Sequence, residues 1–102
     1  MSQGPNRYRV EASAATKALL RETLKRAYEL GVGETVASTA RQIMKRLETD
    51  PLIFGEPVHQ LRRMKLEMRV GIISPLSVEY GVDAESRIVY IKHFYLSGEP
   101  GR

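Results

Sequence analysis

The 102-residue chain has no cysteine, and none of its apolar runs approaches the ~20 residues of a membrane-spanning helix. Disulfides and thiolate metal sites are therefore excluded, and a reducing compartment suits the chain. Its polar first residues also lack the apolar segment of a secretory signal peptide. We expect a cytoplasmic protein without a membrane segment, forming one domain over residues 1–102 with flexible tails at 1–6 and 97–102.

Sequence patterns that mark common catalytic centres are missing as well. There is no glycine-rich phosphate loop, no nucleophile elbow and no HExxH pattern. The two histidines, His59 and His93, are far apart in the sequence, and neither stands at metal-ligand spacing from other ligand-type residues. We therefore expect neither a metal site nor a cofactor.

What the chain does have is a local concentration of positive charge. Sixteen Lys and Arg residues against twelve Asp and Glu residues give a formal net charge of +4, which alone implies only solubility. The segment 60–70 is much more basic, with Arg62, Arg63, Lys65 and Arg69 against the single acid Glu67. A local cluster of this kind indicates a polyanionic partner more strongly than the total charge does.

The first half of the sequence predicts a strand and two helices. Charged and apolar residues alternate over 7–11, as in a half-buried strand. Ser13 fits a helix N-cap and Gly31 fits a helix stop. The apolar stripe of this helix is Leu20, Leu24, Ala27 and Tyr28. A second helix, predicted over about 34–48 and ended by Asp50-Pro51, has the stripe Val36, Ala40, Ile43 and Leu47.

The second half predicts three strands, over 63–70, 76–82 and 87–96. Apolar residues alternate in the first two, and the third is apolar at nearly every position. The expected fold class is therefore α+β, in the order β-α-α-β-β-β. A helical hairpin should pack on one face of a small antiparallel sheet.

The strand pattern also predicts which side chains face the helices. If an even turn over 83–86 joins the last two strands, Val82 pairs with Arg87, and the inner residues include Val78, Tyr80, Val82, Val89 and Ile91. The opposite face should carry Arg63, Lys65, Glu67, Arg69, Ser77, Glu79, Tyr90, Lys92 and Phe94. By the same alternation, His93 and Tyr95 should point to the helix side, near the end of the strand. An odd turn would exchange the two faces of the last strand.

The sharpest candidate site is the row of cations on that outer face. Residues two apart on a strand stand ~6.6 Å apart on one face, close to the spacing of successive phosphates. The candidates for RNA binding are Arg62, Arg63, Lys92, Tyr90 and Phe94. The rings of the last two can stack on unpaired bases. The competing interpretation is a solvated sheet face with Lys/Glu pairs between strands.

Other candidate side chains can move protons or mark an interface. His93, with Tyr95 beside it, can donate or accept a proton during RNA cleavage. The carboxylate of Glu56, in the loop expected before the basic strand, can act as a general base. A structural histidine and an ordinary loop glutamate are the alternatives. The last strand, apolar on both faces, is either buried on both sides or covered by a partner polypeptide.

The pattern from Arg7 to about Tyr95 resembles the RelE/ParE superfamily of bacterial toxins. The resemblance rests on the element order and on short segments, which read DP, FGEP, KLEMR, VEYGVD and RIVYI. It implies a toxin that a cognate antitoxin neutralises. RelE-like members cut messenger RNA in the ribosomal A site, whereas ParE-like members inhibit DNA gyrase.

If the chain is RelE-like, the resemblance implies catalytic roles for Lys65, Arg69, Glu56, His93 and Tyr95. The sequence departs from the ribonuclease pattern at Ser77, where an arginine is usual, and at Glu67, where a second lysine is common. Our leading hypothesis is a toxin that acts as a RelE-like, ribosome-dependent mRNA endoribonuclease. The alternatives are a ParE-like gyrase inhibitor and a catalytically inactive RelE-fold binding protein. The expected partners are a cognate antitoxin and ribosome-bound mRNA. In the ParE-like alternative, DNA gyrase takes the place of the ribosome and its mRNA.

Overall fold

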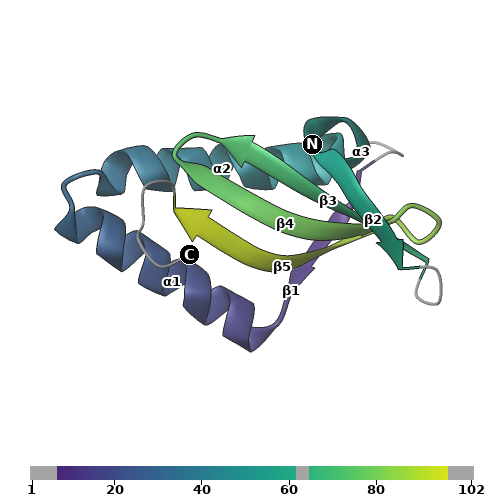
Figure 1. Ribbon diagram of the computed structural model, residues 1–102, viewed down its shortest axis with the longest axis horizontal. Helices are drawn as coiled ribbons and strands as arrows, with labels where there is room; N and C mark the ends of the chain where they lie inside the picture. Colours follow the sequence, from purple (N-terminus) through teal and green to yellow (C-terminus); the bar gives the residue numbers. More distant parts are fainter. Residues whose placement is uncertain (1–6, 62–64, 97–102) are drawn as a thin grey trace.

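Five strands form one mixed sheet, and two long helices pack on one of its faces (Figure 1). The computed structural model describes residues 7–61 and 65–96. The predicted tails at 1–6 and 97–102 lie outside the described residues. In chain order the elements are β1 (Arg9–Ala12), α1 (Ala14–Glu29), α2 (Gly33–Thr49), α3 (Pro51–Phe54), β2 (Glu56–Leu61), β3 (Leu66–Ile73), β4 (Leu76–Asp83) and β5 (Ile88–Leu96).

The sheet is mixed, whereas the sequence predicted a purely antiparallel one. Its strand order is β1-β5-β4-β3-β2; β1 runs parallel to β5, and the other neighbouring pairs are antiparallel. The predicted α+β class is confirmed. β2, however, occupies residues 56–61, where a loop was expected. Because Pro57 and a register shift beside it disturb the alternation in this segment, the sequence pattern did not predict the strand.

The helices begin and end close to the predicted residues. The Ser13 hydroxyl accepts a hydrogen bond from the Thr16 amide at 3.1 Å and so caps α1. Gly31, with a φ of 84°, adopts the left-handed conformation that turns the chain towards α2. α2 ends at Thr49, before Asp50-Pro51. Among the helices of the described residues, none combines the length and the apolarity that a membrane span needs.

The core lies between the helices and the sheet face that they cover. The predicted stripe of α2 is buried, and the buried core also includes Leu76, Val78, Tyr80, Val82, Val89 and Ile91. On α1, Ala27 is buried, while Leu20 and Leu24 are partly buried against this core. Tyr28 is an exception to the predicted stripe, because its side chain is exposed. Its ring lies over Gly33, where any larger residue would collide with it.

The turn between β4 and β5 pairs the two strands in a different register from the predicted one, but the same side chains face the helices. Asp83 pairs with Ile88, so the turn occupies residues 84–87, and Val82 pairs with Val89 instead of Arg87. The register thus shifts by two residues. Because the side-chain period of a strand is two, the same residues still face the helices at this end of the hairpin.

The side chains of β3 point to the opposite faces of the sheet from those predicted. The register pairs Glu67 with Val82 and places Arg69 beside Tyr80. Directly paired residues share a face of the sheet. Glu67 and Arg69 therefore point to the helix side, and the row of cations predicted for the open face is absent from the described part of β3.

Apolar residues of β3 take the open side instead. Leu66 and Met68 are buried there, although no helix in the described part of the chain covers this face. They pack across Gly81 of β4, where an added Cβ would lie 2.8 Å from the Met68 sulfur. The missing side chain at Gly81 makes room for Met68, which explains why an apolar set can be buried on this side of the sheet.

Candidate functional site

A bulge in β5 decides which side chains reach the open face near the end of the strand. Glu79 pairs with His93, but the next residue along β4, Tyr80, pairs with Ile91, so Lys92 is left without a partner on β4. A bulge of this kind re-aims the side chains that follow it. His93 and Tyr95 therefore lie on the open face, contrary to their predicted parity.

The same bulge places Phe94 in the core. Phe94 pairs with Val78, faces the helices and is 4% exposed. The prediction that Phe94 lies on the open face was therefore wrong, and its ring cannot stack on a base there. The backbone carbonyl of Lys92, at the bulge, accepts a hydrogen bond of 3.4 Å from the Thr16 hydroxyl of α1. The capped start of α1 thus contacts the irregular part of the strand.

Four polar side chains meet on the open face around the bulge, and we call them the Glu79 cluster: Glu79, Lys92, His93 and Tyr95. The Lys92 Nζ lies 3.8 Å from one carboxylate oxygen of Glu79. The Tyr95 hydroxyl lies 3.5 Å from the other oxygen. The rings of His93 and Tyr95 have their centroids 4.4 Å apart. The carboxylate of Glu79 is therefore close to an ammonium and to a phenol, and the imidazole of His93 lies beside that phenol.

The Glu79 cluster is accessible without being fully solvated. The Glu79 side chain is only 18% exposed, whereas that of Lys92 is 64% exposed. His93 and Tyr95 are half-buried. Partial burial strengthens the electrostatic interactions of such groups relative to those in bulk water. The cluster can therefore hold an anionic group near Lys92 and exchange protons with it through the imidazole and the phenol.

Tyr90 and Glu56, two other predicted site residues, lie on the same face but at different distances from the Glu79 cluster. Tyr90 is 41% exposed and precedes the bulge, next to Gly81 on the neighbouring strand. Glu56 is on the same row of the sheet as Glu79 and His93, through the pairs that Val70 makes with β2 and β4. Three strand spacings of ~4.8 Å separate Glu56 from His93. Glu56 is therefore not part of the Glu79 cluster.

Lys65, a predicted catalytic residue, lies away from this cluster. It directly precedes β3, has a φ of 55° and exposes 75% of its side chain. Its Nζ lies 3.7 Å from the carboxylate of Glu85, in the β4–β5 turn. The left-handed backbone at Lys65 interrupts the alternation predicted from Arg63 onwards. Arg62 and Arg63, predicted to bind RNA, lie outside the described residues.

Arg69, the other predicted catalytic cation, is a core residue. It is 8% exposed, and its guanidinium donates hydrogen bonds to the Glu67 carboxylate and to the Gly55 carbonyl. Its Nε has no hydrogen-bond partner within the described part of the chain. A buried arginine with these partners holds β3 to the start of β2. It cannot contact a ligand on the open face.

Tyr80 completes the network around Arg69. Its hydroxyl donates to the Pro51 carbonyl at 2.6 Å and accepts from the Gly55 amide at 2.9 Å. Burial raises the pKa of Tyr80, although the Gly55 amide and the guanidinium of Arg69 partly oppose this rise. The ring of Phe54 stacks on that of Tyr80, with centroids 6.2 Å apart. These contacts fix the 51–55 segment against β3 and β4.

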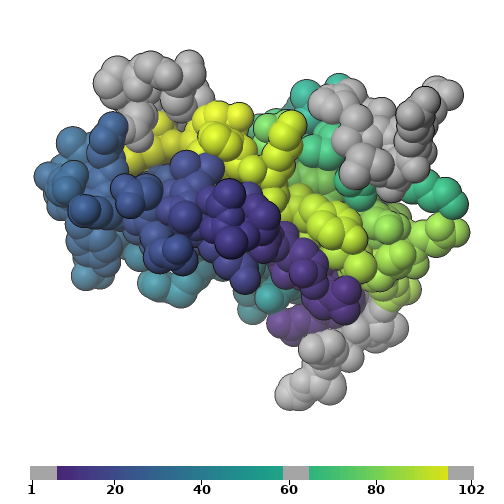
Figure 2. Space-filling view, turned by 90° about the horizontal axis from the view of Figure 1, so that it is seen from below, coloured from purple at the N-terminus to yellow at the C-terminus, as the bar shows by residue number. Residues whose placement is uncertain are grey.

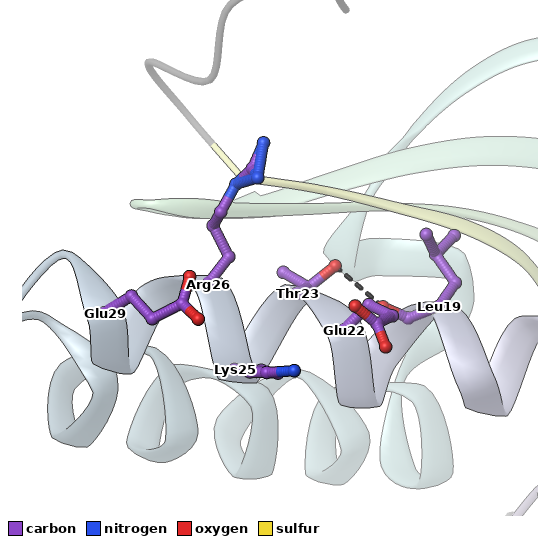
Figure 3. Close-up of a pocket in the computed structure, with 6 residues that line it drawn as sticks. All are labelled: Leu19, Glu22, Thr23, Lys25, Arg26 and Glu29. Carbon is purple, nitrogen blue, oxygen red and sulfur yellow. Dashed lines mark hydrogen bonds between the residues drawn. The ribbon is translucent and has the colours of Figure 1, made fainter.

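A hollow on α1 has no chemistry comparable to that of the Glu79 cluster. It has a volume of about 320 Å³ and is lined by Leu19, Glu22, Thr23, Lys25, Arg26 and Glu29. The Thr23 hydroxyl bonds back to the Leu19 carbonyl within the helix, and Arg26 extends from α1 towards the end of β5 (Figure 3). Two acidic and two basic side chains line it, so the hollow favours no charge of ligand.

The sequence thus identified three of the four cluster residues but assigned them to different faces. Glu79 was predicted on the open face and was not recognised as a site residue. The predicted register set Glu79 opposite Tyr90, so no pattern in the sequence linked it to Lys92 and His93, and only the observed pairing with His93 does so. No three His, Asp or Glu side chains among the described residues are close enough together to hold a metal ion.

Comparison of the chain with protein-family models, with curated proteins and with solved structures gives no match. Its function is therefore inferred from the chemistry of the open face and from the resemblance in the sequence.

Proposed function

We propose that the chain is a RelE-like toxin that cuts messenger RNA on the ribosome, with its catalytic centre in the Glu79 cluster. The observation that carries the proposal is that Lys92 and Tyr95 approach Glu79, and His93 lies beside Tyr95, on a sheet face that none of the described helices covers. Acid–base groups and a cation are what RNA cleavage through the 2′-hydroxyl requires. Lys65 and Arg69 have no part in this centre.

The four side chains can divide the reaction between them. His93 takes the proton of the 2′-hydroxyl, and the freed oxygen attacks the adjacent phosphorus. The bond from phosphorus to the 5′-oxygen breaks, and Tyr95 protonates this leaving oxygen. The imidazolium of His93 then returns a proton to Tyr95. The products are a 2′,3′-cyclic phosphate and a 5′-hydroxyl end.

Lys92 and Glu79 act on charge and position in this scheme. The ammonium of Lys92 offsets the negative charge that grows on the phosphoryl oxygens in the transition state. A single well-placed donor of this kind lowers the activation free energy by about 3–4 kcal/mol. Glu79 contacts both Lys92 and Tyr95 and holds them beside each other. Tyr90, exposed on the same strand, offers a ring on which an unpaired base can stack.

The order of the elements supports the RelE/ParE-like part of the proposal. A first strand, two long helices and consecutive antiparallel strands follow each other in the expected sequence, although the short helix α3 and a fourth strand, β2, come in addition to the expected elements. The antitoxin and the ribosome are the partners that this assignment requires.

A second candidate is favoured by the loss of the expected cations. Arg69 is buried and Lys65 is paired with Glu85, so Lys92 is the one lysine or arginine of the predicted catalytic and RNA-binding set that the described residues present on the open face. A RelE-fold protein that binds a partner without cutting RNA, or a ParE-like gyrase inhibitor, needs no cation row.

Expression of the chain without an antitoxin separates these functions. Growth should stop, and transcripts should carry new 5′-hydroxyl ends within codons. Unaffected growth with good soluble expression contradicts the toxin proposal. Growth arrest with DNA-damage signalling and intact transcripts identifies the gyrase inhibitor instead.

A further inference from the structure

The edge strand β1 places an arginine, Arg9, on the open face of the sheet, where the sequence pattern did not identify it as a site residue. β1 runs parallel to β5 and pairs Glu11 with Tyr90. Figure 2 shows the two strands side by side at the surface, with β1 in purple and β5 in yellow. Val10 and Ala12 pack against the core. Because successive side chains of a strand alternate, Arg9 and Glu11 point to the open face.

The ion pair that Arg9 forms on this face is easily exchanged. Its Nε lies 2.7 Å from a carboxylate oxygen of Glu11, and the two side chains are 69% and 46% exposed. An ion pair with this exposure contributes little to stability. A phosphate accepts two parallel hydrogen bonds from a guanidinium and binds it more strongly than a single contact does. A phosphate that reaches the open face can therefore take the place of Glu11 beside Arg9.

Arg9 and Lys92 lie on either side of Tyr90 on the open face. Tyr90 precedes Lys92 by two residues on β5, a step of ~6.6 Å. Arg9 pairs with Ile88, so it lies one strand across from β5 and one such step beyond Tyr90. The two cations are therefore about 14 Å apart, close to the length of two nucleotide steps of an extended strand. The exposed ring of Tyr90 lies between them, so cation, ring and cation match the repeat of phosphate and base.

The surroundings of Tyr90 favour an unpaired base. Its neighbour on β4 is Gly81, which has no side chain, and Leu66 and Met68 pack over this position. A base on the ring of Tyr90 would stack on it and cover apolar surface beside it. A double helix keeps its bases stacked on one another and does not offer a free face. The surface around Tyr90 is therefore suited to a single strand.

We propose that Arg9, Tyr90 and Lys92 form a binding path for single-stranded RNA, in which Arg9 holds a phosphate outside the catalytic centre. The proposal rests on the proposed function, because the path ends at the Glu79 cluster. Arg9 is a positioning residue, since it lies too far from Lys92 to touch the reacting atoms. Glu11 holds Arg9 on the open face when no RNA is bound, and it competes with the phosphate for the guanidinium.

The test measures how a fluorescent single-stranded RNA of about six nucleotides binds the full chain, by anisotropy between about 50 and 200 mM salt. Every 2′-hydroxyl of this probe is methylated, so the probe cannot be cut. Arg9→Ala should weaken binding about three- to tenfold and reduce the slope of log affinity against log salt by about 0.7, the value for one phosphate contact of a single strand. Arg9→Lys should keep the wild-type slope. Tyr90→Ala should weaken binding without changing the slope, because stacking releases no counterions.

Arg7 and its partner provide matched controls. Arg7 is also exposed and pairs with a glutamate, Glu48 of α2, at 2.8 Å. Arg7→Ala removes the same charge as Arg9→Ala but should weaken binding less than about twofold, with the slope unchanged. Glu11→Gln should strengthen binding about threefold or more, because Arg9 loses its competitor. Glu48→Gln changes the net charge equally and should strengthen binding less than about twofold.

Three results would overturn the binding path. One is no binding of the probe up to about 1 mM protein. Another is the same loss of affinity and slope in Arg7→Ala as in Arg9→Ala, since binding would then follow net charge alone. The third is unchanged binding in Tyr90→Ala. Because the probe cannot be cut, a wild type that binds it through Arg9 but cuts no mRNA supports the path and contradicts only the catalytic centre.

Discussion

The rings of His93 and Tyr95 lie 4.4 Å apart on the open face of the sheet, although an unbroken strand would point both towards the helices. The unpaired Lys92 changes the phase of β5 between Ile91 and His93. As a result, one strand supplies core residues and site residues on either side of a single irregularity. The candidate site therefore depends on the bulge as much as on the residues themselves.

The bulge predicts that truncating two aromatic residues of β5 destabilises the protein to very different extents. Phe94 is 4% exposed and Tyr90 is 41% exposed. Phe94→Ala should lower the free energy of unfolding by about 3–5 kcal/mol because it opens a cavity in the core. Tyr90→Ala should cost about 1 kcal/mol or less. Urea unfolding of both variants measures the difference; equal costs would mean that β5 alternates without a bulge.

Much of the fold follows from local patterns in the sequence. The cap at Ser13, the turn at Gly31 and the stop at Asp50-Pro51 are local signals, and each lies where it was predicted. The faces of β4 were also predicted correctly, because Val78 and Tyr80 alternate with polar residues in a central strand. Local hydrogen bonding and periodicity suffice for such features.

The faces of β3 and of the end of β5 depend on contacts that are distant in sequence. Arg69 is buried because the carbonyl of Gly55 and the hydroxyl of Tyr80 are beside it, in segments that the sequence does not connect to it. Met68 turns to the open side because Gly81 leaves space there. Alternation predicts that two faces exist, but tertiary packing decides which face is which.

The burial of Arg69 predicts a structural role for this residue. Arg69→Ala leaves the Gly55 carbonyl and the Glu67 carboxylate without their donor, so the free energy of unfolding should fall by about 3 kcal/mol. Lys65→Ala, at an exposed pair, should change it by about 0.5 kcal/mol or less. Thermal and urea unfolding compare the two. A stable Arg69→Ala variant would contradict the buried network.

The raised pKa of Tyr80 predicts a loss of stability at alkaline pH. The unfolded chain releases this phenolic proton near the ordinary pKa of 10.0, whereas burial keeps it bound in the folded state at that pH. Stability should therefore be unaffected below about pH 10 and fall as the pH rises above it. Tyr80→Phe should remove this part of the fall, and Tyr90→Phe, at an exposed ring, should not. Urea unfolding at a series of pH values above and below 10 tests the difference.

The two lysines of the candidate sites provide a matched comparison. Lys92 and Lys65 are both exposed, and each lies within 4 Å of one glutamate, at 3.8 and 3.7 Å. Lys92→Ala should reduce transcript cleavage about a hundredfold or more, because the transition state loses its cation. Lys65→Ala should leave the rate within about twofold. The same loss in both variants would indicate general electrostatic attraction of RNA instead of a localised centre.

The most direct measurement of the central claim is the rate at which the wild type and His93→Gln cut an mRNA in a translating extract, followed as new 5′ ends. Glutamine keeps the polarity and approximate size of histidine but cannot exchange a proton in the same way. We predict that the wild type cuts and that His93→Gln is slower by about 10²- to 10⁴-fold, with unchanged folding. Equal rates for the two proteins, or no cutting by the folded wild type, would contradict a catalytic centre in the Glu79 cluster.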